Sequence, residues 1–278
     1  MKNTPPPPPP EIRPGQSLEL LKTLHILTRD GKLNQDARRK LKQVYHLCNF
    51  LEPLLAELGG RDFHLVDHGA GKSYLGFILY DLFLKTRPEA RVIGIETRTE
   101  LVASAQALAT TLAFERMAFF CRTVEAAMTM PEIPEQVEMV TALHACDTAT
   151  DDAIRFALAK SARFIALVPC CQAEVASELR RRKNESFTAT PLSELWRHPI
   201  HTREFGSHVT NVLRCLLLVA HGYQVTVTEL VGWEHSMKNE LIIARKIAPA
   251  TTNPSARSRA EAILAALDLE NLRERFVY

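Results

Sequence analysis

The stretch Asp67–Lys72 (DHGAGK) decides how this sequence folds. A short apolar run, Phe63–Asp67, leads into it, and an apolar helical pattern, Ser73–Lys85, follows it. A strand, a glycine-rich turn and a helix in this order place a nucleotide-type ligand at the carboxyl end of a sheet. We therefore predict a ligand-binding loop at residues 67–72.

Two phosphate-binding patterns fit this loop poorly. A dinucleotide fingerprint needs its third glycine where the chain has Tyr74, and a P-loop needs a glycine at Val66. Asp67 also places a carboxylate beside the loop, which would repel a pyrophosphate and attract a cationic ligand. S-adenosylmethionine carries an ammonium and a sulfonium, so we predict it as the ligand.

A second acidic residue supports this prediction. Glu96 ends the next predicted strand, 25 residues after Gly71, where its carboxylate is placed to accept hydrogen bonds from both ribose hydroxyls of an adenosine. The alternative is that Asp67 only caps a helix and that Glu96 is a solvated strand end. The spacing of the two acids within one βαβ unit favours the cofactor interpretation.

The sequence after the loop alternates between strand and helix patterns, which is typical of a parallel sheet with helices on its faces. Helices are predicted at 73–85, 99–114, 150–160, 172–183 and 204–221, and strands at 63–67, 91–96, 117–121, 137–143, 164–168, 224–231 and 240–246. The predicted fold class is α/β: a Rossmann-like, mostly parallel sheet with helices on both faces, an antiparallel last strand and an N-terminal helical extension.

Four segments are predicted along the chain. Residues 1–16, with the proline run Pro5–Pro10, form a disordered tail, and residues 17–60 form a helical segment ended by Gly59-Gly60. Residues 61–247 form the Rossmann-like domain. Residues 248–278 are a linker and a C-terminal helix.

Composition adds a few exclusions. The chain has 278 residues, 46% of them hydrophobic, and a formal net charge of +2, so charge alone predicts no partner. No apolar run is long enough for a membrane helix. Six cysteines in a long chain without a signal-like start favour a reducing cytoplasm over a disulfide framework.

The carboxyl ends of the fourth and fifth predicted strands carry Leu143–Asp151 (LHACDTATD) and Pro169–Gln172 (PCCQ). A zinc site here would need the adjacent Cys170 and Cys171 to reach one ion, so no metal is expected. Cys170 is also a candidate nucleophile, since it precedes a helix N-terminus that lowers a thiol pKa. Alternatively, these cysteines are small packing residues, Thr148 or Thr150 caps the next helix, and the dipole of that helix favours Asp151 and Asp152. His144 and Asp147 are predicted to border the cofactor and the reacting atom.

Read together, five motifs resemble the methyltransferase-like domain family of class I S-adenosylmethionine-dependent methyltransferases, widespread in bacteria. They are DHGAGKSYLG from Asp67, IGIE at Ile93–Glu96, LHACDTATD from Leu143, VPCCQ from Val168 and WEHSMKNEL from Trp233. The LHAC and PCC turns are similar to those of eukaryotic tRNA 2′-O-methyltransferases that act in the acceptor stem. The resemblance covers residues 32–247 and departs from the commoner Gly-x-Gly-x-Gly pattern at Ser73. It implies that Asp67, Gly69, Gly71 and Glu96 bind the cofactor.

Methyl transfer is an in-line displacement, so the enzyme must position the acceptor and handle one proton. Candidates for that task are His144, Asp147, Cys170, Glu234, His235 and Lys238. The last three lie in the loop between the last two predicted strands, and the alternative is that this loop is a hairpin with ordinary polar residues. Basic clusters at 38–42 and 180–183, and cations around Trp196, predict an RNA substrate. The alternatives are solvated helix faces, a protein or small-molecule acceptor, or a non-catalytic scaffold that holds the cofactor or RNA.

Overall fold

A computed structural model describes residues 9–59, 63–143, 145–169, 172–183, 191–230, 240–247 and 252–278. The chain divides into two compact units, Met1–Arg122 and Thr123–Tyr278, and each is described by itself. No helix within the described ranges is both long and apolar enough to cross a membrane.

The first unit joins two helices to a βαβαβ arrangement. Its elements are α1 (Leu18–Thr23), α2 (Gln35–Leu58), β1 (Phe63–His68), α3 (Tyr74–Leu79), a π-helical turn (Tyr80–Leu84), β2 (Ala90–Glu96), α4 (Thr99–Thr111) and β3 (Met117–Cys121). Asn34 starts α2 because its side chain accepts the N–H of Ala37, and Gly59 ends it with a φ of 62°. The sequence therefore marks both ends of the longest helix in this unit.

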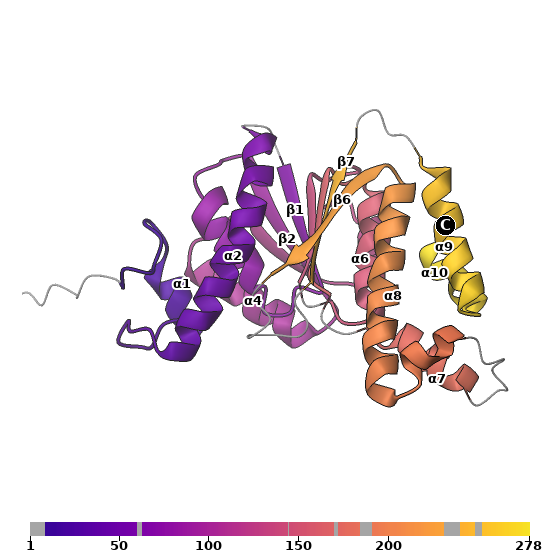
Figure 1. Ribbon diagram of the computed structural model, residues 1–278. Coiled ribbons are helices and arrows are strands. Elements are labelled where there is room, and N and C mark those ends of the chain that lie inside the picture. The colour runs from indigo at the N-terminus through magenta and orange to yellow at the C-terminus, as the bar shows by residue number, and fades with distance from the viewer. Residues whose placement is uncertain are drawn as a thin grey trace, which may run out of the picture. The chain divides into compact units, whose positions relative to one another are not determined.

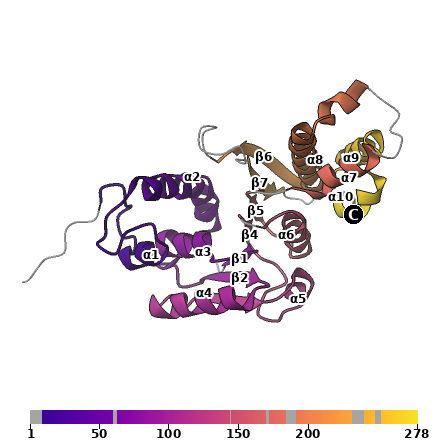
Figure 2. The same ribbon diagram turned by 90° about the horizontal axis from the view of Figure 1, so that it is seen from below.

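The three strands of this unit run parallel in the order β3-β2-β1. Asp67 lies opposite Gly94 in the register, so the carboxyl ends of β1 and β2 meet at one edge. Figure 2 shows α4 on one face of β1 and β2, and α2 and α3 on the other. This edge carries the glycine-rich loop.

The predicted N-terminal tail is described from Pro9 onward, and there it is attached to the first unit. The Arg13 guanidinium donates to Asn49 Oδ1 at 2.6 Å, and the Ser17 N–H donates to Asp81 Oδ2 at 2.8 Å. Asp81 is 1% exposed. These bonds hold residues 13–17 in place, although their sequence has too few apolar residues to indicate packing.

The second unit holds the remaining strands and helices. They are α5 (Val124–Met128), β4 (Met139–Ala142), α6 (Thr148–Ala159), β5 (Phe164–Leu167), α7 (Glu174–Lys183), a 3₁₀ helix (Pro191–Trp196), α8 (Pro199–Ala220), β6 (Tyr223–Glu229), β7 (Glu240–Lys246), α9 (Pro254–Ala266), a 3₁₀ turn (Glu270–Leu272) and α10 (Arg273–Phe276). The strand order is β4-β5-β7-β6, with β4 and β5 parallel and β7 antiparallel to both neighbours.

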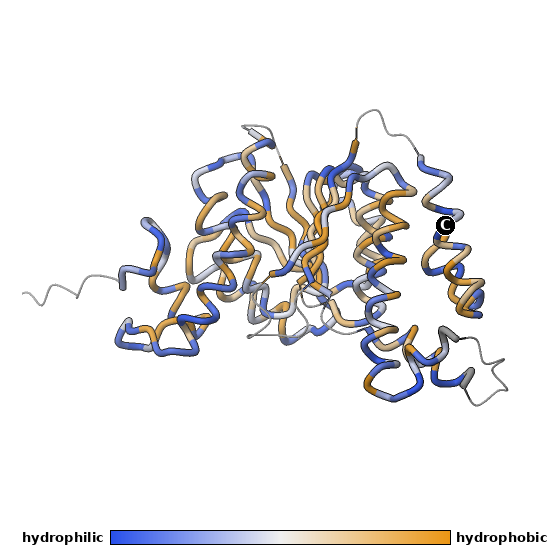
Figure 3. The backbone as a smooth tube through the Cα atoms, viewed as in Figure 1, coloured by the Kyte–Doolittle hydropathy of each residue, from blue (hydrophilic) through white to orange (hydrophobic). Residues whose placement is uncertain are grey.

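The fold class is therefore α/β and Rossmann-like, with an antiparallel last strand, as predicted. Figure 3 shows hydrophobic residues concentrated along the strands. The predicted helix at 73–85 continues through the π-helical turn, and α8 begins at Pro199, five residues before its predicted start. Proline suits the first turn of a helix, where its missing N–H would have no partner.

The C-terminal helices bury an apolar cluster against α7 and α8 (Figure 1). Trp196 belongs to this cluster, is 2% exposed and stacks on Phe205 with ring centroids 4.9 Å apart. Trp196 is therefore not available to bind RNA together with the cations around it, and this part of the RNA prediction is wrong. An indole in an apolar core contributes more by burial than it would on a polar surface.

Acid should destabilise the fold through His68, which is 2% exposed in β1. Burial lowers the pKa of His68 to about 4 from the ordinary value of 6.5. The unfolded chain then binds more protons between these values, so the free energy of unfolding should fall by up to about 3 kcal/mol as the pH drops from about 6.5 to 4.

Urea unfolding of the wild type and of His68→Asn over this pH range measures the effect. We expect the variant to lose most of the slope between pH 6.5 and 4, whatever its stability at pH 7. An equal slope in both proteins would show that other groups cause it.

Candidate active site

The loop after β1 adopts a left-handed backbone at alternate residues. The φ angles of Gly69, Gly71 and Ser73 are 60°, 57° and 50°. Ser73 thus takes the conformation of a third glycine, at a cost of about 1 kcal/mol for a residue with a Cβ. Ser73 is 1% exposed and its hydroxyl donates to Asp67 Oδ2 at 3.2 Å, which helps to offset that cost. Serine in place of the third glycine of the Gly-x-Gly-x-Gly pattern therefore leaves the loop conformation unchanged.

Two further glycines let this loop lie close to the sheet. A Cβ on Gly76 in α3 would lie 2.5 Å from Ser73 Oγ of the loop. One on Gly94 in β2 would lie 2.5 Å from Phe119 Cδ1 of the neighbouring strand β3, and 3.5 Å from Ala70 Cβ of the loop. Neither of the two shorter distances is compatible with a side chain unless its neighbour moves. The chain has no glycine at Tyr74, but Gly76, two residues later, allows the close contact between the helix and the loop.

Three N–H groups of the loop are bonded within the protein. Ala70 donates to Ile95 O at 3.1 Å, Ser73 donates to Ala70 O at 2.6 Å, and Gly71 donates to Glu96 Oε2 at 2.8 Å. A phosphate-binding loop turns such groups toward its anion. These bonds agree with the sequence argument against a phosphate ligand.

Glu96 is held by several hydrogen bonds at this edge. Besides Gly71, it accepts N–H bonds from the backbones of Thr97 and Arg98 and from the Arg98 guanidinium, all between 2.8 and 3.1 Å. Burial by itself raises the pKa of Glu96, but the Arg98 guanidinium and these N–H groups outweigh it and lower the pKa to about 2. The carboxylate is therefore charged across the whole physiological range.

The chemistry of this edge fits S-adenosylmethionine. Asp67, 3% exposed, and Glu96, 6% exposed, end adjacent strands on either side of the glycine loop. A carboxylate suits the ammonium of the methionine part, and a second one suits a ribose diol. The structure thus places four of the five residues that the sequence assigned to the cofactor, Asp67, Gly69, Gly71 and Glu96, in one loop and the adjoining strand end. The fifth, His144, lies outside the described residues.

Asp147 follows β4 in the second unit and has an unusual backbone, with φ 52° and ψ −122°. Its Oδ1 accepts the N–H groups of Ala173 and Glu174 at 2.9 and 3.3 Å, so it caps the start of α7. The alternative that Thr150 caps α6 is wrong, since its hydroxyl donates to Ala145 O at 2.5 Å. Strained residues of this kind concentrate at functional sites.

A buried polar network supports the Asp147 turn. Arg214 of α8 is 0% exposed and donates to both carboxylate oxygens of Asp151, at 2.7 and 2.8 Å, and to the Asp147 carbonyl at 2.8 Å. Asn211 accepts from Arg214 and from Gln172, and donates to Glu240. Asp151 therefore does more than favour a helix dipole: it is the counter-ion of a buried guanidinium.

Several predicted site residues lie outside the described residues, namely His144, Cys170, Cys171, Glu234, His235 and Lys238. Cys146 is described and exposed. In the ranges that the structure does describe, no three His, Cys, Asp or Glu side chains gather where they could hold a metal ion.

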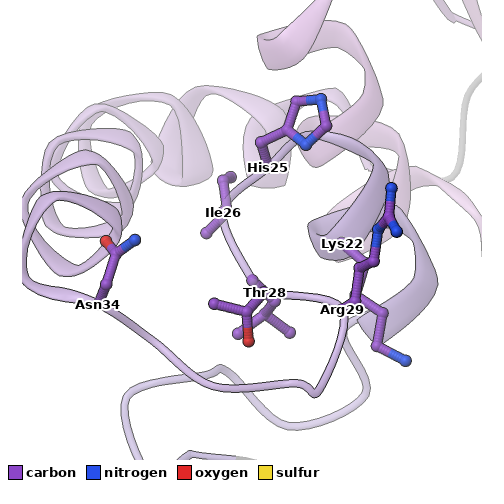
Figure 4. A pocket seen from close by; sticks show the side chains of 7 residues that line it. Lys22, His25, Ile26, Thr28, Arg29 and Asn34 are labelled. Carbon is purple, nitrogen blue, oxygen red and sulfur yellow. The ribbon is translucent and has the colours of Figure 1, made fainter.

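A cavity of about 360 Å³ lies in the N-terminal helical segment (Figure 4). Figure 4 shows Asn34, which starts α2, across the cavity from Lys22 and Arg29, with Ile26 and Thr28 between them. Lys22, Arg29 and His25 bring cationic or titratable side chains to its lining. Lys22 is paired with Glu19 at 2.9 Å, so Arg29 is the cation of this lining that favours an anionic ligand.

The model of a methyltransferase domain family matches residues 39–178, about half of the chain. The chain belongs to this methyltransferase domain family. S-adenosylmethionine is accordingly the cofactor of the enzyme. The matched range includes the glycine loop, Glu96 and the Asp147 turn.

Solved structures show similarity at low sequence identity. An rRNA methylase from Streptococcus thermophilus is 11% identical with a TM-score of 0.43, over 72% of this chain and 96% of that one. Magnesium protoporphyrin IX methyltransferase from Synechocystis PCC 6803, solved with bound SAH, is 12% identical with a TM-score of 0.45, over 82% and 93%. No curated protein matches the sequence.

Sequence reasoning about this methyltransferase missed three residues. The left-handed conformation of Ser73 could have been predicted, because Ser73 stands where the Gly-x-Gly-x-Gly pattern has its third glycine. Nothing in the sequence indicated that Arg98 folds back on Glu96 or that Arg214 reaches Asp151, 63 residues away.

The structural role of Asp147 can be separated from a catalytic one. Asp147→Asn keeps Oδ1 as an acceptor for α7, so we expect an unchanged thermal midpoint. Asp147→Ala loses the cap and keeps a backbone that alanine tolerates poorly, so the free energy of unfolding should fall by about 1–2 kcal/mol. Thermal and urea unfolding measure both. An unchanged kcat in Asp147→Asn would remove Asp147 from the candidates for proton handling.

Proposed function

We propose that this methyltransferase transfers a methyl group from S-adenosylmethionine to RNA, with a ribose 2′-hydroxyl as the acceptor. The observation that carries the RNA part is a set of exposed cations in the first two turns of α2, which we call the α2 basic face. Its members are Arg38, Arg39, Lys40 and Lys42.

The position of the α2 basic face is informative. The N-terminal end of α2 adds partial positive charge beside these cations. Arg38 is paired with Glu11 at 2.7 Å, and Arg39 lies 3.9 Å from Asp36. The cavity lined by Lys22, His25 and Arg29 adjoins the N-cap of the same helix. A polyanion such as RNA would bind both features with its phosphates.

On the cofactor side, we propose that Asp67 binds the ammonium, that Gly69 and Gly71 let the loop approach the nucleoside, and that Glu96 accepts the ribose hydroxyls. His144 is proposed to border the same cofactor. When bound, S-adenosylmethionine supplies the methyl group on a sulfonium. The protein's own tasks are to hold the acceptor oxygen in line and to accept its proton.

The candidates for the proton are the predicted residues His144, Asp147, Glu234, His235 and Lys238. The reaction needs one of them within hydrogen-bond reach of the acceptor. Cys170 is the candidate for a different route, in which a thiolate adds to a pyrimidine ring before methylation. The similarity of the LHAC and PCC turns to those of tRNA 2′-O-methyltransferases supports the hydroxyl over the ring carbon. The same resemblance and the cysteine content support a cytoplasmic location.

Glu96→Ala should weaken S-adenosylmethionine binding by at least about tenfold, because hydrogen bonds to a carboxylate are worth about 1.5–3 kcal/mol each. Isothermal calorimetry measures this. Glu115→Ala, which removes an exposed carboxylate from the same unit, is the control and should leave the affinity unchanged. Equal affinities for the wild type and Glu96→Ala would contradict the proposed cofactor site.

RNA binding should depend on the α2 basic face. Lys40→Ala/Lys42→Ala should weaken binding to a tRNA transcript and reduce the slope of log K against log salt by about 1.4–1.8, since each phosphate contact contributes about 0.7–0.9. Fluorescence anisotropy between 50 and 200 mM salt measures the slope. The matched control, Arg257→Ala/Arg259→Ala on α9, removes two exposed cations and should keep the wild-type slope. Equal slopes in both double variants would argue against this surface.

The acceptor class has its own test. Nucleoside mass spectrometry of RNA incubated with the enzyme and labelled S-adenosylmethionine should show a labelled 2′-O-methylnucleoside. A labelled base would support the cysteine route, and labelled protein or small molecules in an extract without labelled RNA would support the other acceptor classes. A scaffold would yield no S-adenosylhomocysteine with any extract.

A further inference from the structure

The guanidinium of Arg98 lies on the carboxylate that the cofactor ribose is proposed to use. Arg98 Nε donates to Glu96 Oε1 at 3.0 Å, and Arg98 Nη2 donates to Glu96 Oε2 at 3.0 Å. This forked contact occupies both oxygens at once. A ribose diol, which also presents two adjacent donors, needs the same two oxygens.

The same guanidinium also covers the glycine loop. A Cβ built on Gly71 would lie 3.9 Å from Arg98 Nη2, an ordinary van der Waals distance. Arg98 therefore fills space directly above the residue where the backbone must admit a nucleoside. The contacts with Glu96 and with Gly71 are independent observations, and both put Arg98 where the ribose is proposed to bind.

Exposure shows which partner of the pair can move. The side chain of Glu96 is 6% exposed, whereas that of Arg98 is 60% exposed. The backbone N–H groups of Gly71, Thr97 and Arg98 hold the carboxylate whether or not the guanidinium is there. The guanidinium is thus the replaceable part of the network, and it can leave without disturbing the core.

We propose that Arg98 sets the cofactor affinity by acting as an internal placeholder, which the ribose hydroxyls displace from Glu96. The proposal rests on the proposed role of Glu96 in binding the ribose. Because the guanidinium competes for the carboxylate, the apparent affinity is reduced by the fraction of molecules in which Arg98 is seated. Ligands without ribose hydroxyls gain nothing from its removal.

Calorimetry with S-adenosylhomocysteine tests the placeholder. Arg98→Ala and Arg98→Gln should bind it about two- to fivefold more tightly than the wild type, the range expected for loss of an exposed ion pair. Arg98→Gln keeps most of the side-chain length and provides the same test if the alanine variant fails to fold. Arg273→Ala, which removes an exposed arginine paired with Glu261, is the matched control and should bind like the wild type.

The 2′,3′-dideoxy analogue of S-adenosylhomocysteine separates displacement from a general effect on the loop. For this ligand the Arg98 variants should show no gain over the wild type. Equal or weaker binding of S-adenosylhomocysteine to the Arg98 variants would overturn the proposal, and so would an equal gain for both ligands. An unchanged affinity in Glu96→Ala would instead overturn the proposed ribose site itself, so the two failures are distinguishable.

Discussion

The hydrogen bond from the Gly71 N–H to the Glu96 carboxylate is the interaction on which the described cofactor edge depends. It joins the loop after β1 to the end of β2 and uses a buried acid that stays charged. Two left-handed glycines, a left-handed Ser73 and the close approach of Gly76 and Gly94 all bring the loop near enough for this bond. The charge on Glu96 then makes the edge suitable for hydroxyl donors and cations rather than for phosphate.

In the second unit, the corresponding role belongs to Arg214. A guanidinium with no exposed surface is stable only if its donors are bonded, and Asp151, Asn211 and the Asp147 carbonyl accept from it. The network holds the strained Asp147 turn while Asp147 caps α7. The turn after β4 is thus fixed by hydrogen bonds both to its backbone carbonyl and to its side chain.

How far the sequence predicted the site depends on the range of the interactions involved. That Asp67, Gly69, Gly71 and Glu96 lie at one edge of the sheet could be predicted because a βαβ unit fixes their spacing within 30 residues. Trp196 was predicted to be exposed because the sequence pattern of an aromatic residue among cations does not show whether the ring lies on the surface or in the core. The capping role of Asp147 was missed because its partners, Ala173 and Glu174, come 26 and 27 residues later and are backbone groups that no side-chain pattern marks.

The sequence by itself determined the alternation of strands and helices, the glycine loop and the acid at the end of each of the first two strands, because these follow from local periodicity and short spacing. The methyltransferase family followed from the resemblance of five motifs along the chain. Only the tertiary structure decided that Arg98 lies on Glu96, that Arg214 pairs with Asp151 and that residues 13–17 are attached to the first unit. The physical reason is that a charged side chain pairs with the opposite charge that lies nearest in the fold, and burial strengthens that pairing. The order of the residues does not show which charges come close together.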